Sequence, residues 1–317
     1  MNVPKISVCI PAYNHAGFIA QAIESVLGQI CADYELLIID DCSRDDTTYV
    51  IRSCAEKDTR IRCRINPTNL GMVANWNACL EEARGEYIKF LCSDDLLSSP
   101  HAVAQMAARL DGDRSVALVA SARNFIDVDS GVIRTLDPLK GSGEQSGKVV
   151  INRCLREQHN LIGEPTAVMF RKSDGRRGFL PYYRQIVDLE MWFHLLEKGK
   201  LSYIDAPLCS FRIHAGQQTE RNTNTLNVLD DNVHLCREYM DKPYVSIGYV
   251  EKRFIQCDNV YKMWKMHRRG LVGKEAAVEA IEKWYGYRRF RVIYPAYKVY
   301  KPLRKLKRRI RRLCTAT

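Results

Sequence analysis

Apolar runs alternate with segments of helical spacing through the first 120 residues. Five short runs rich in Ile, Val, Leu and Tyr predict β-strands, at 6–10, 34–39, 61–65, 87–91 and 116–120. The intervening segments carry apolar residues three or four positions apart and predict helices over 18–29, 45–54, 73–84 and 100–110. This alternation predicts an α/β fold with a mostly parallel sheet and helices on both faces.

The pattern changes in the second half of the chain. Residues 137–147 are rich in Gly and Ser and predict a mobile loop, whereas 168–171 and 207–213 predict strands and 188–198 predicts a helix. After about residue 222 the spacing is helical. We therefore expect an α/β domain over 1–220 and a helical C-terminal region over 221–317. Gly85, which follows a predicted helix, is expected to end it in the left-handed conformation.

The composition is that of an ordinary globular protein. Of the 317 residues, 46% are hydrophobic and 27% charged, and no apolar run reaches the roughly 18 residues that span a bilayer. The chain enters its first strand without a basic leader or cleavage site, which predicts a protein that is not secreted. The 12 cysteines form no CxxC pair, which favours a reduced, cytoplasmic set without zinc or disulfides.

The positive charge lies at the C-terminal end. Of the 48 Lys and Arg residues, 13 lie within 283–317, where there is no Asp or Glu, so the rest has 35 bases against 37 acids. Five apolar residues recur there at helical spacing: Val299, Leu303, Leu306, Ile310 and Leu313. Pro302 suits the first turn of such a helix. A basic amphipathic helix predicts binding of an anionic membrane surface through 298–313, peripherally on the inner face of the cell membrane. A disordered tail or a nucleic-acid contact is the alternative, although nucleic-acid binding needs only the charges.

Two adjacent acids, Asp94 and Asp95, directly follow the predicted strand 87–91. Adjacent carboxylates repel unless a cation lies beside them, and hard oxygen ligands suit Mg²⁺ or Mn²⁺ shared with phosphates. Asn14 and Asp41 follow two other strands, and ligands of parallel sheets bind at the carboxyl ends of the strands. The sequence thus indicates a site for a nucleoside diphosphate. A solvated turn that caps the next helix is the simpler interpretation of the two acids.

Six short segments resemble the family 2 glycosyltransferases of the GT-A fold. Residues 8–14 read VCIPAYN, 38–47 read IIDDCSRDDT, 69–71 read NLG, 90–95 read FLCSDD, 188–192 read DLEMW and 211–214 read FRIH. The resemblance covers roughly the first 220 residues. It implies a Rossmann-like mixed sheet with a C-terminal helical extension, and metal-dependent, inverting transfer of a sugar from a nucleoside-diphosphate sugar.

The resemblance also implies roles for individual residues. Asp95 and His214 would bind the divalent metal, Mn²⁺ or Mg²⁺, and Asp188 would be the catalytic base. Arg212 would neutralise the diphosphate or fix its loop. The nucleotide side would comprise Pro11, Tyr13, Asn14, Asp41, Asn69 and Asp94.

Asp41 suits a uracil or thymine base, which favours a UDP- or dTDP-sugar, although guanine also carries a ring N–H. The acceptor would be a saccharide or a lipid-linked sugar, used in making a surface polysaccharide or glycolipid.

The chain departs from the family pattern at two positions. Cys92 stands where many members have Asp, and Val187 stands where many have Glu before the catalytic Asp. Three other functions remain open from the residues alone. They are a nucleotidyltransferase, a non-catalytic nucleotide-sugar-binding protein and a nucleic-acid-binding protein. Asp188 could also be only a helix cap, and Trp192 could be an acceptor platform or part of the core.

Overall fold

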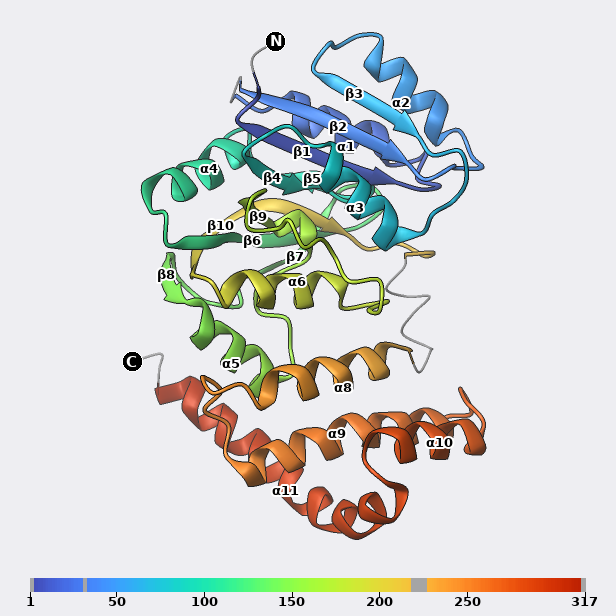
Figure 1. The fold of residues 1–317 in the computed structure, drawn as a ribbon, viewed down its shortest axis with the longest axis vertical. Coiled ribbons are helices and arrows are strands. Elements are labelled where there is room, and N and C mark those ends of the chain that lie inside the picture. The colour runs from blue at the N-terminus through green and yellow to red at the C-terminus, as the bar shows by residue number, and fades with distance from the viewer. Residues whose placement is uncertain (1–2, 31–32, 218–226, 315–317) are drawn as a thin grey trace. The chain divides into compact units, whose positions relative to one another are not determined.

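The computed structural model describes residues 3–30, 33–217 and 227–314. In the last of these ranges, it describes the side chains of residues 229–302 only. The chain forms two compact units, Met1–Gln217 and Gln218–Thr317. Figure 1 shows a sheet flanked by helices in the first unit and helices alone in the second. The functions predicted for the two regions stay predictions.

A ten-stranded mixed sheet forms the centre of the first unit (Figure 1), in the order β3-β2-β1-β4-β9-β6-β10-β5. Strands β1, β2, β3 and β4 run parallel, and β9 is antiparallel to both β4 and β6. Off this order, β7 pairs with β6 and β8 with β10. The strands are β1 (Ile6–Ala12), β2 (Tyr34–Asp40), β3 (Ile61–Ile65), β4 (Tyr87–Phe90), β5 (Leu96–Leu97), β6 (Val116–Ile126), β7 (Val132–Leu136), β8 (Gly143–Ser146), β9 (Val168–Arg171) and β10 (Lys200–Arg212).

Alternate strand residues face two helical layers. Val8 and Ile10 share one core with residues of α1 (Ile19–Leu27), α2 (Thr47–Ala55) and α4 (Ala102–Gly112). On the other face, α3 (Met72–Glu82) and α6 (Val187–Leu196) pack through aromatic side chains, with Trp76 6.0 Å from Phe90 and Trp192 5.8 Å from Phe170 between ring centroids. Trp192 is completely buried, so it belongs to the core and is no acceptor platform. The carboxyl ends of the parallel strands β1, β2, β3 and β4 lie at the same edge of the sheet.

Two local predictions were wrong. Gly85 does not adopt the left-handed conformation; a Cβ there would lie 2.4 Å from the backbone nitrogen of Ser7, so glycine is required by the close approach of β1. The segment 137–147 is no simple loop, because β8 lies within it and pairs with β10, and α5 (Gly147–Glu157) begins at its end. Strand β10 is longer than the predicted 207–213 and carries register shifts around Pro207.

The second unit consists of α8 (Asn227–Met240), α9 (Tyr249–Arg268), α10 (Lys274–Trp284) and α11 (Tyr287–Cys314). Aromatic pairs join α9 and α11, with Phe254 stacked on Tyr300 at 3.9 Å between ring centroids. Pro302 lies inside α11 and not in the first turn of a helix, so that prediction was wrong. Within the described residues, no helix combines the length and the apolar character needed to cross a membrane. The side chains of Leu303, Leu306, Ile310 and Leu313 lie outside the described part.

Candidate active site

The loops after β1 and β2 are joined by hydrogen bonds from side chains. Asn14, with a φ of 53°, accepts a bond from the backbone N–H of Arg44 at 2.8 Å, and its own N–H donates to Ser43 Oγ at 2.8 Å. The N–H of His15 donates to Thr47 Oγ1 at 2.8 Å. Pro11 lies within β1, and this network gives the loop after it, which carries Tyr13 and Asn14, a defined conformation at the carboxyl edge of the sheet.

Asp41 organises the turn at 69–71. Its carboxylate accepts hydrogen bonds from the backbone N–H groups of Leu70 and Gly71, each at 2.8 Å, and from Asn66 at 2.8 Å. Asn69 donates to the backbone carbonyl of Asp41 at 3.0 Å. Asp41 and Asn69 therefore hold each other in place, and their contact with a base stays a prediction.

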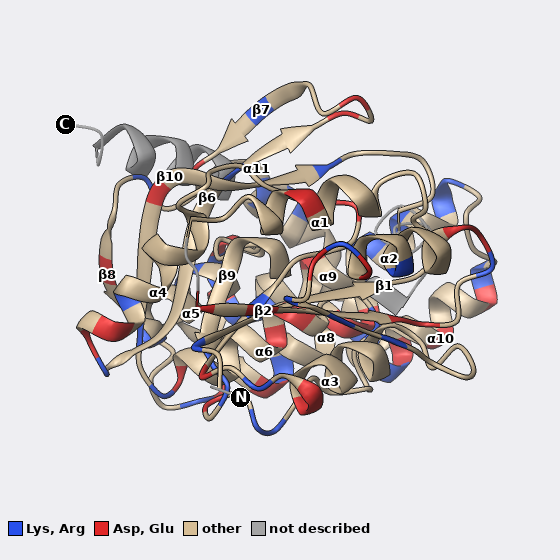
Figure 2. Ribbon diagram, turned by 90° about the horizontal axis from the view of Figure 1, so that it is seen from above, with Lys and Arg blue, Asp and Glu red and all other residues tan. Residues whose placement is uncertain are grey.

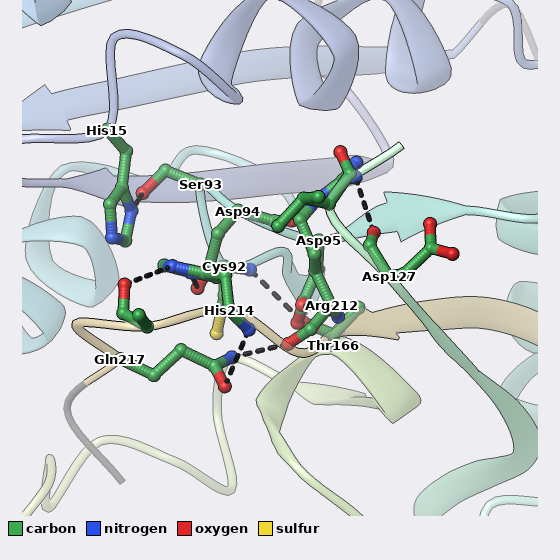
Figure 3. Close-up of polar contacts among 12 residues, drawn as sticks. His15, Cys92, Ser93, Asp94, Asp95, Asp127, Thr166, Arg212, His214 and Gln217 are labelled. Atoms are coloured by element: carbon green, nitrogen blue, oxygen red, sulfur yellow. Dashed lines mark hydrogen bonds and ion pairs between the residues drawn. The ribbon is translucent and has the colours of Figure 1, made fainter. Parts of the chain in front are cut away.

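Asp94 and His214 lie side by side at this edge (Figure 3). The Nε2 of His214 is 3.0 Å from Asp94 Oδ2, and its Nδ1 is 3.0 Å from the carbonyl oxygen of Ala215. The hydrogen bond with Asp94 raises the pKa of His214, against the effect of its burial. Burial alone would raise the pKa of Asp94, but the bond from His214 and the charge of His15 lower it. Both side chains are oriented by contacts with the fold.

Asp95 points elsewhere. It is completely buried, its Oδ2 accepts a hydrogen bond from Thr166 Oγ1, and its Oδ1 accepts one from the backbone N–H of Arg212 at 3.0 Å (Figure 3). Burial and the charge of Asp94 raise the pKa of Asp95 well above its usual range. The two adjacent acids are not a solvated turn, and their carboxylates have different surroundings.

Arg212 is buried and surrounded by acceptors of the protein. Its Nε donates to the carbonyl oxygen of Asp94 at 2.8 Å, and its Nη1 donates to the carbonyl oxygens of Asp127 and Val128 at 3.0 and 2.9 Å. Its Nη2 donates to Gln21 at 2.7 Å. These contacts support the role of fixing the loop, while the contact with a diphosphate stays a prediction.

Asp188 lies in the first turn of α6. Ile186 is the N-cap residue, so Asp188 does not cap the helix. Burial raises its pKa to about 7, although the backbone N–H of Leu189 donates to the carboxylate and opposes this effect. A carboxylate that titrates near neutral pH suits a general base.

Asp188, Asp94 and Asp95 share one neighbour, Cys92. After burial, the charges of Asp95, Asp94 and Asp188 contribute to a pKa of the Cys92 thiol well above its usual range. Cys92 also donates its backbone N–H to Thr166 Oγ1 at 3.1 Å. Asp188 and the two acids after β4 therefore all lie near the same side chain.

The segment before β9 is a part of this site that sequence reasoning missed. It contains η1 (Pro165–Ala167), whose Thr166 holds Asp95. Glu164 forms an ion pair with the buried Arg123, and both charges act on the pKa of Asp188, Glu164 raising it and Arg123 lowering it. A buried arginine in a strand, as at Arg123, was the available signal, because such a charge requires a partner.

In the described part of the chain, two groups of three side chains could hold a metal ion. One comprises His15, Asp94 and His214, and the other comprises Cys92, Asp94 and Asp95. In each, one ligand atom per residue lies within 4.8 Å of the others. Asp94 is common to both groups, and oxygen and imidazole donors fit a divalent ion. His15 was not among the predicted ligands.

Comparison with known proteins identifies the family. Residues 7–177, more than half of the chain, match the family described as "Glycosyl transferase family 2". The chain belongs to glycosyltransferase family 2. The predicted family and enzyme class are thereby confirmed, and the nucleotidyltransferase and non-catalytic alternatives are set aside.

Two relatives illustrate the range of the family. The uncharacterized protein MT1568 of Mycobacterium tuberculosis (strain CDC 1551 / Oshkosh) is 32% identical over 237 residues, which cover 72% of this chain and 73% of that protein. The chondroitin synthase of Escherichia coli is 30% identical over 222 residues, covering 68% of this chain and 30% of the synthase. The match therefore spans less than a third of that larger enzyme.

Solved structures confirm the GT-A fold. Staphylococcus aureus TarS 1-349 in complex with UDP-GlcNAc gives a TM-score of 0.66 at 18% identity, covering 88% of this chain and 81% of the TarS 1-349 chain. The mannosyltransferase PcManGT from Pyrobaculum calidifontis, in complex with GDP-Man and Mn²⁺, gives a TM-score of 0.59 at 15% identity over 95% and 84% of the two chains. The two complexes contain different bases, so the shared fold leaves the base of the donor open.

Proposed function

We propose that this glycosyltransferase moves a sugar from a nucleoside-diphosphate sugar, of the UDP or dTDP type, to a saccharide or lipid-linked acceptor with inversion. The observation that carries the proposal is the pair formed by Asp94 and His214 at the carboxyl edge of the sheet, with Asp188 beside the same Cys92. The pair would bind the metal that stabilises the leaving diphosphate. Asp188, whose pKa lies near neutral pH, would remove the proton of the acceptor hydroxyl.

The metal would be held by Asp94 and His214. The carbonyl of Ala215 faces Nδ1 of His214, which orients Nε2 towards Asp94, and such outer contacts fix the ligating nitrogen of a metal-bound histidine. A bound Mn²⁺ or Mg²⁺ would supply Lewis-acid stabilisation of the leaving diphosphate. We assign the first carboxylate ligand to Asp94 in place of Asp95, because both oxygens of Asp95 accept hydrogen bonds from the protein.

Asp188 would remove the proton of the acceptor hydroxyl. General bases work best when their pKa lies near the operating pH, and the pKa of Asp188 is about 7. Glu164 would take the place of the acid that many family members have at the position of Val187, because its charge raises the pKa of Asp188.

The nucleotide would lie over the loops of β1 and β2. Asp41 accepts hydrogen bonds from two backbone N–H groups and would place the turn 69–71 beside the base. Tyr13 would stack on the base, with Pro11 and Asn14 shaping the loop. The complex of TarS with UDP-GlcNAc supports a uridine donor by analogy, while the GDP-Man complex keeps guanine as the competing choice.

We also propose peripheral attachment to an anionic membrane surface from the cytoplasmic side. On α11, Val292 is 77% exposed and Val299 67% exposed, and they continue the apolar spacing predicted for 298–313. Arg291 and Lys298 are exposed beside them. Figure 2 shows basic and acidic residues interspersed along the ribbon, whereas 283–317 holds 13 Lys and Arg and no Asp or Glu, so an anionic surface would meet the C-terminal helix. Synthesis of a surface polysaccharide or glycolipid would place the acceptor at that membrane.

The donor is tested by a thermal-shift panel of UDP, dTDP, GDP and CDP, each with and without Mn²⁺. A ligand that binds only the folded state raises the melting temperature by mass action. We expect metal-dependent stabilisation by UDP or dTDP, its loss in Asp94→Asn, and its retention in the control His101→Gln, whose histidine is exposed. Loss in Asp95→Asn alone would return the ligand role to Asp95, and no stabilisation by any diphosphate would refute the donor class.

The membrane proposal is tested separately with the full chain. Most of the protein should sediment with vesicles of phosphatidylcholine that contain phosphatidylglycerol, and the bound fraction should fall as the salt concentration rises. It should fall further in the double variant Val292→Glu/Val299→Glu. Equal sedimentation with pure phosphatidylcholine, or no effect of the two glutamates, would refute it.

A further inference from the structure

We infer that His15 is a third protein ligand of the metal, and that the set of His15, Asp94 and His214 makes the centre select Mn²⁺ over Mg²⁺. This inference rests on the proposed function and assigns the metal of the same site. His15 lies in the loop after β1, whereas Asp94 follows β4 and His214 follows β10. Three elements distant in the sequence thus bring two imidazoles and one carboxylate together (Figure 3).

The fold holds His15 from two directions. Its backbone N–H donates to Thr47 Oγ1 at 2.8 Å, which joins the loop to the start of α2. Its Nδ1 lies 2.7 Å from the hydroxyl of Ser93, the residue directly before Asp94. A side chain fixed in this way loses little further freedom when it binds an ion, which is the condition for a preorganised ligand.

The three donors are close enough to bind one ion. One ring nitrogen of each histidine and a carboxylate oxygen of Asp94 lie within 4.8 Å of one another. Two neighbouring ligands at about 2.1 Å from one octahedral ion are about 3.0 Å apart, and His214 Nε2 and Asp94 Oδ2 already have a separation of 3.0 Å. The imidazole rings of His15 and His214 meet edge to face, with centroids 5.8 Å apart, and Phe18 packs against His214 at 4.6 Å.

The competing group of Cys92, Asp94 and Asp95 fits such an ion less well. Both oxygens of Asp95 accept hydrogen bonds, from Thr166 and from the backbone of Arg212. Cys92 offers sulfur, a soft donor that hard ions disfavour. Of the two candidate groups, the one containing His15 therefore has the better donors.

The nature of the donors determines the preference for a metal. Carboxylates, carbonyls and water suit both Mg²⁺ and Mn²⁺, whereas imidazole is a softer donor that the harder Mg²⁺ tolerates less well than Mn²⁺ does. A set of two imidazoles and one carboxylate should discriminate against Mg²⁺ and retain Mn²⁺. Replacing His15 with Asp should provide an oxygen ligand in place of the imidazole. The difference between the affinities for Mn²⁺ and Mg²⁺ should then become smaller.

The test measures metal binding directly, without turnover. Mn²⁺ is titrated into the full-length protein and the free ion is quantified by electron paramagnetic resonance, with Mg²⁺ as the competitor. We expect His15→Gln to weaken Mn²⁺ binding by about 10- to 100-fold, the range seen when a supporting group of a metal site is lost. His101→Gln is the control. Pulsed measurement of ¹⁴N couplings should detect two imidazoles in the wild type and one in His15→Gln.

The outcomes separate this inference from the proposed function. Unchanged Mn²⁺ affinity and unchanged ¹⁴N couplings in His15→Gln, with loss of binding in His214→Gln, would refute the role of His15 and leave the proposed function intact. If the wild type bound no Mn²⁺ with UDP, dTDP, GDP or CDP present, the metal-dependent function would be refuted instead. Circular dichroism and the melting temperature show whether each variant is folded, and His15→Asp provides a second reading through its Mg²⁺ affinity.

Discussion

Replacing Asp188 with Asn should stabilise the folded chain while it removes most of the activity. Burial raises the pKa of Asp188 from its ordinary 3.8 to about 7, so folding favours the protonated carboxyl group. Its contribution to stability is therefore fully present below about pH 4 and is lost as the pH rises through about 7. At about 1.4 kcal/mol for each pH unit, the difference amounts to about 4 kcal/mol. Asn has no charge to bury, so the variant should be more stable at pH 8 by an amount approaching that figure.

Two assays check this reasoning. Urea unfolding at pH 8 and pH 4 gives the free energy of unfolding of the wild type and of Asp188→Asn. The gap between them should be wide at pH 8 and should nearly close at pH 4. Activity should fall by about 100- to 10,000-fold in the variant, the usual effect of losing a general base. In the wild type, kcat/KM should decline below about pH 7 and reach roughly one tenth of its plateau at pH 6.

The exposed Asp129 provides the matched control, because Asp129→Asn removes a carboxylate from a solvent-exposed side chain. Its activity and its pH dependence should equal those of the wild type. A flat activity profile from pH 5 to pH 8 would refute the assignment of Asp188 as the base. An Asp188→Asn variant that is less stable than the wild type at pH 8 would refute the claim that burial of its charge is unfavourable.

Three further changes test the structure around the site. Gly85→Ala should destabilise the protein by about 1–3 kcal/mol, because its Cβ would overlap the backbone of β1, whereas Gly17→Ala, with nothing within 4 Å, should be nearly neutral in the same urea measurement. Thr166→Val should lower the free energy of unfolding by about 1–3 kcal/mol by removing one of the two hydrogen-bond donors to the buried Asp95, and Thr166→Ser should recover most of this loss. Arg177→Met should cost about 3–5 kcal/mol in thermal or urea unfolding, because Arg177 makes two hydrogen bonds, at 2.8 and 2.6 Å, to the fully buried Glu190; a smaller effect would show that other groups compensate the charge of this carboxylate.

The sequence predicted the strands whose side chains alternate between two apolar layers. Strand β9 (Val168–Arg171) was predicted to the residue, and β1, β2 and β4 within two residues, because their apolar runs are continuous. Strand β8 (Gly143–Ser146) was missed because its residues, Gly, Glu, Gln and Ser, carry no apolar signal and pair only through the distant β10. The strand β8 forms because it pairs with β10, and the local pattern of apolar residues holds no information about that pairing.

The site was predicted at the level of the loops, and less well at the level of single side chains. Asn14, Asp41 and Asp95 were expected at the carboxyl ends of three successive strands, and the structure places each in a loop that follows a strand. Which of two adjacent carboxylates faces inward depends on partners 71 and 117 residues away, Thr166 and Arg212. Spacing along the chain holds no information about contacts of that range.

Arg212 shows why an arginine in a family motif need not touch a phosphate. Its backbone N–H holds Asp95, its Nε holds the carbonyl of Asp94, its Nη1 holds the turn after β6, and its Nη2 donates to Gln21 of α1. A buried guanidinium with several acceptors is an anchor that few other side chains could replace, because five donors in a fixed plane meet several loops at once. Arg212 thereby joins the backbone at Asp94 to the end of β10, two residues before His214. The motif is therefore explained by the geometry of the site alone, and a direct contact with the diphosphate is an additional hypothesis that Arg212→Lys, assayed for diphosphate binding and for stability, would separate from it.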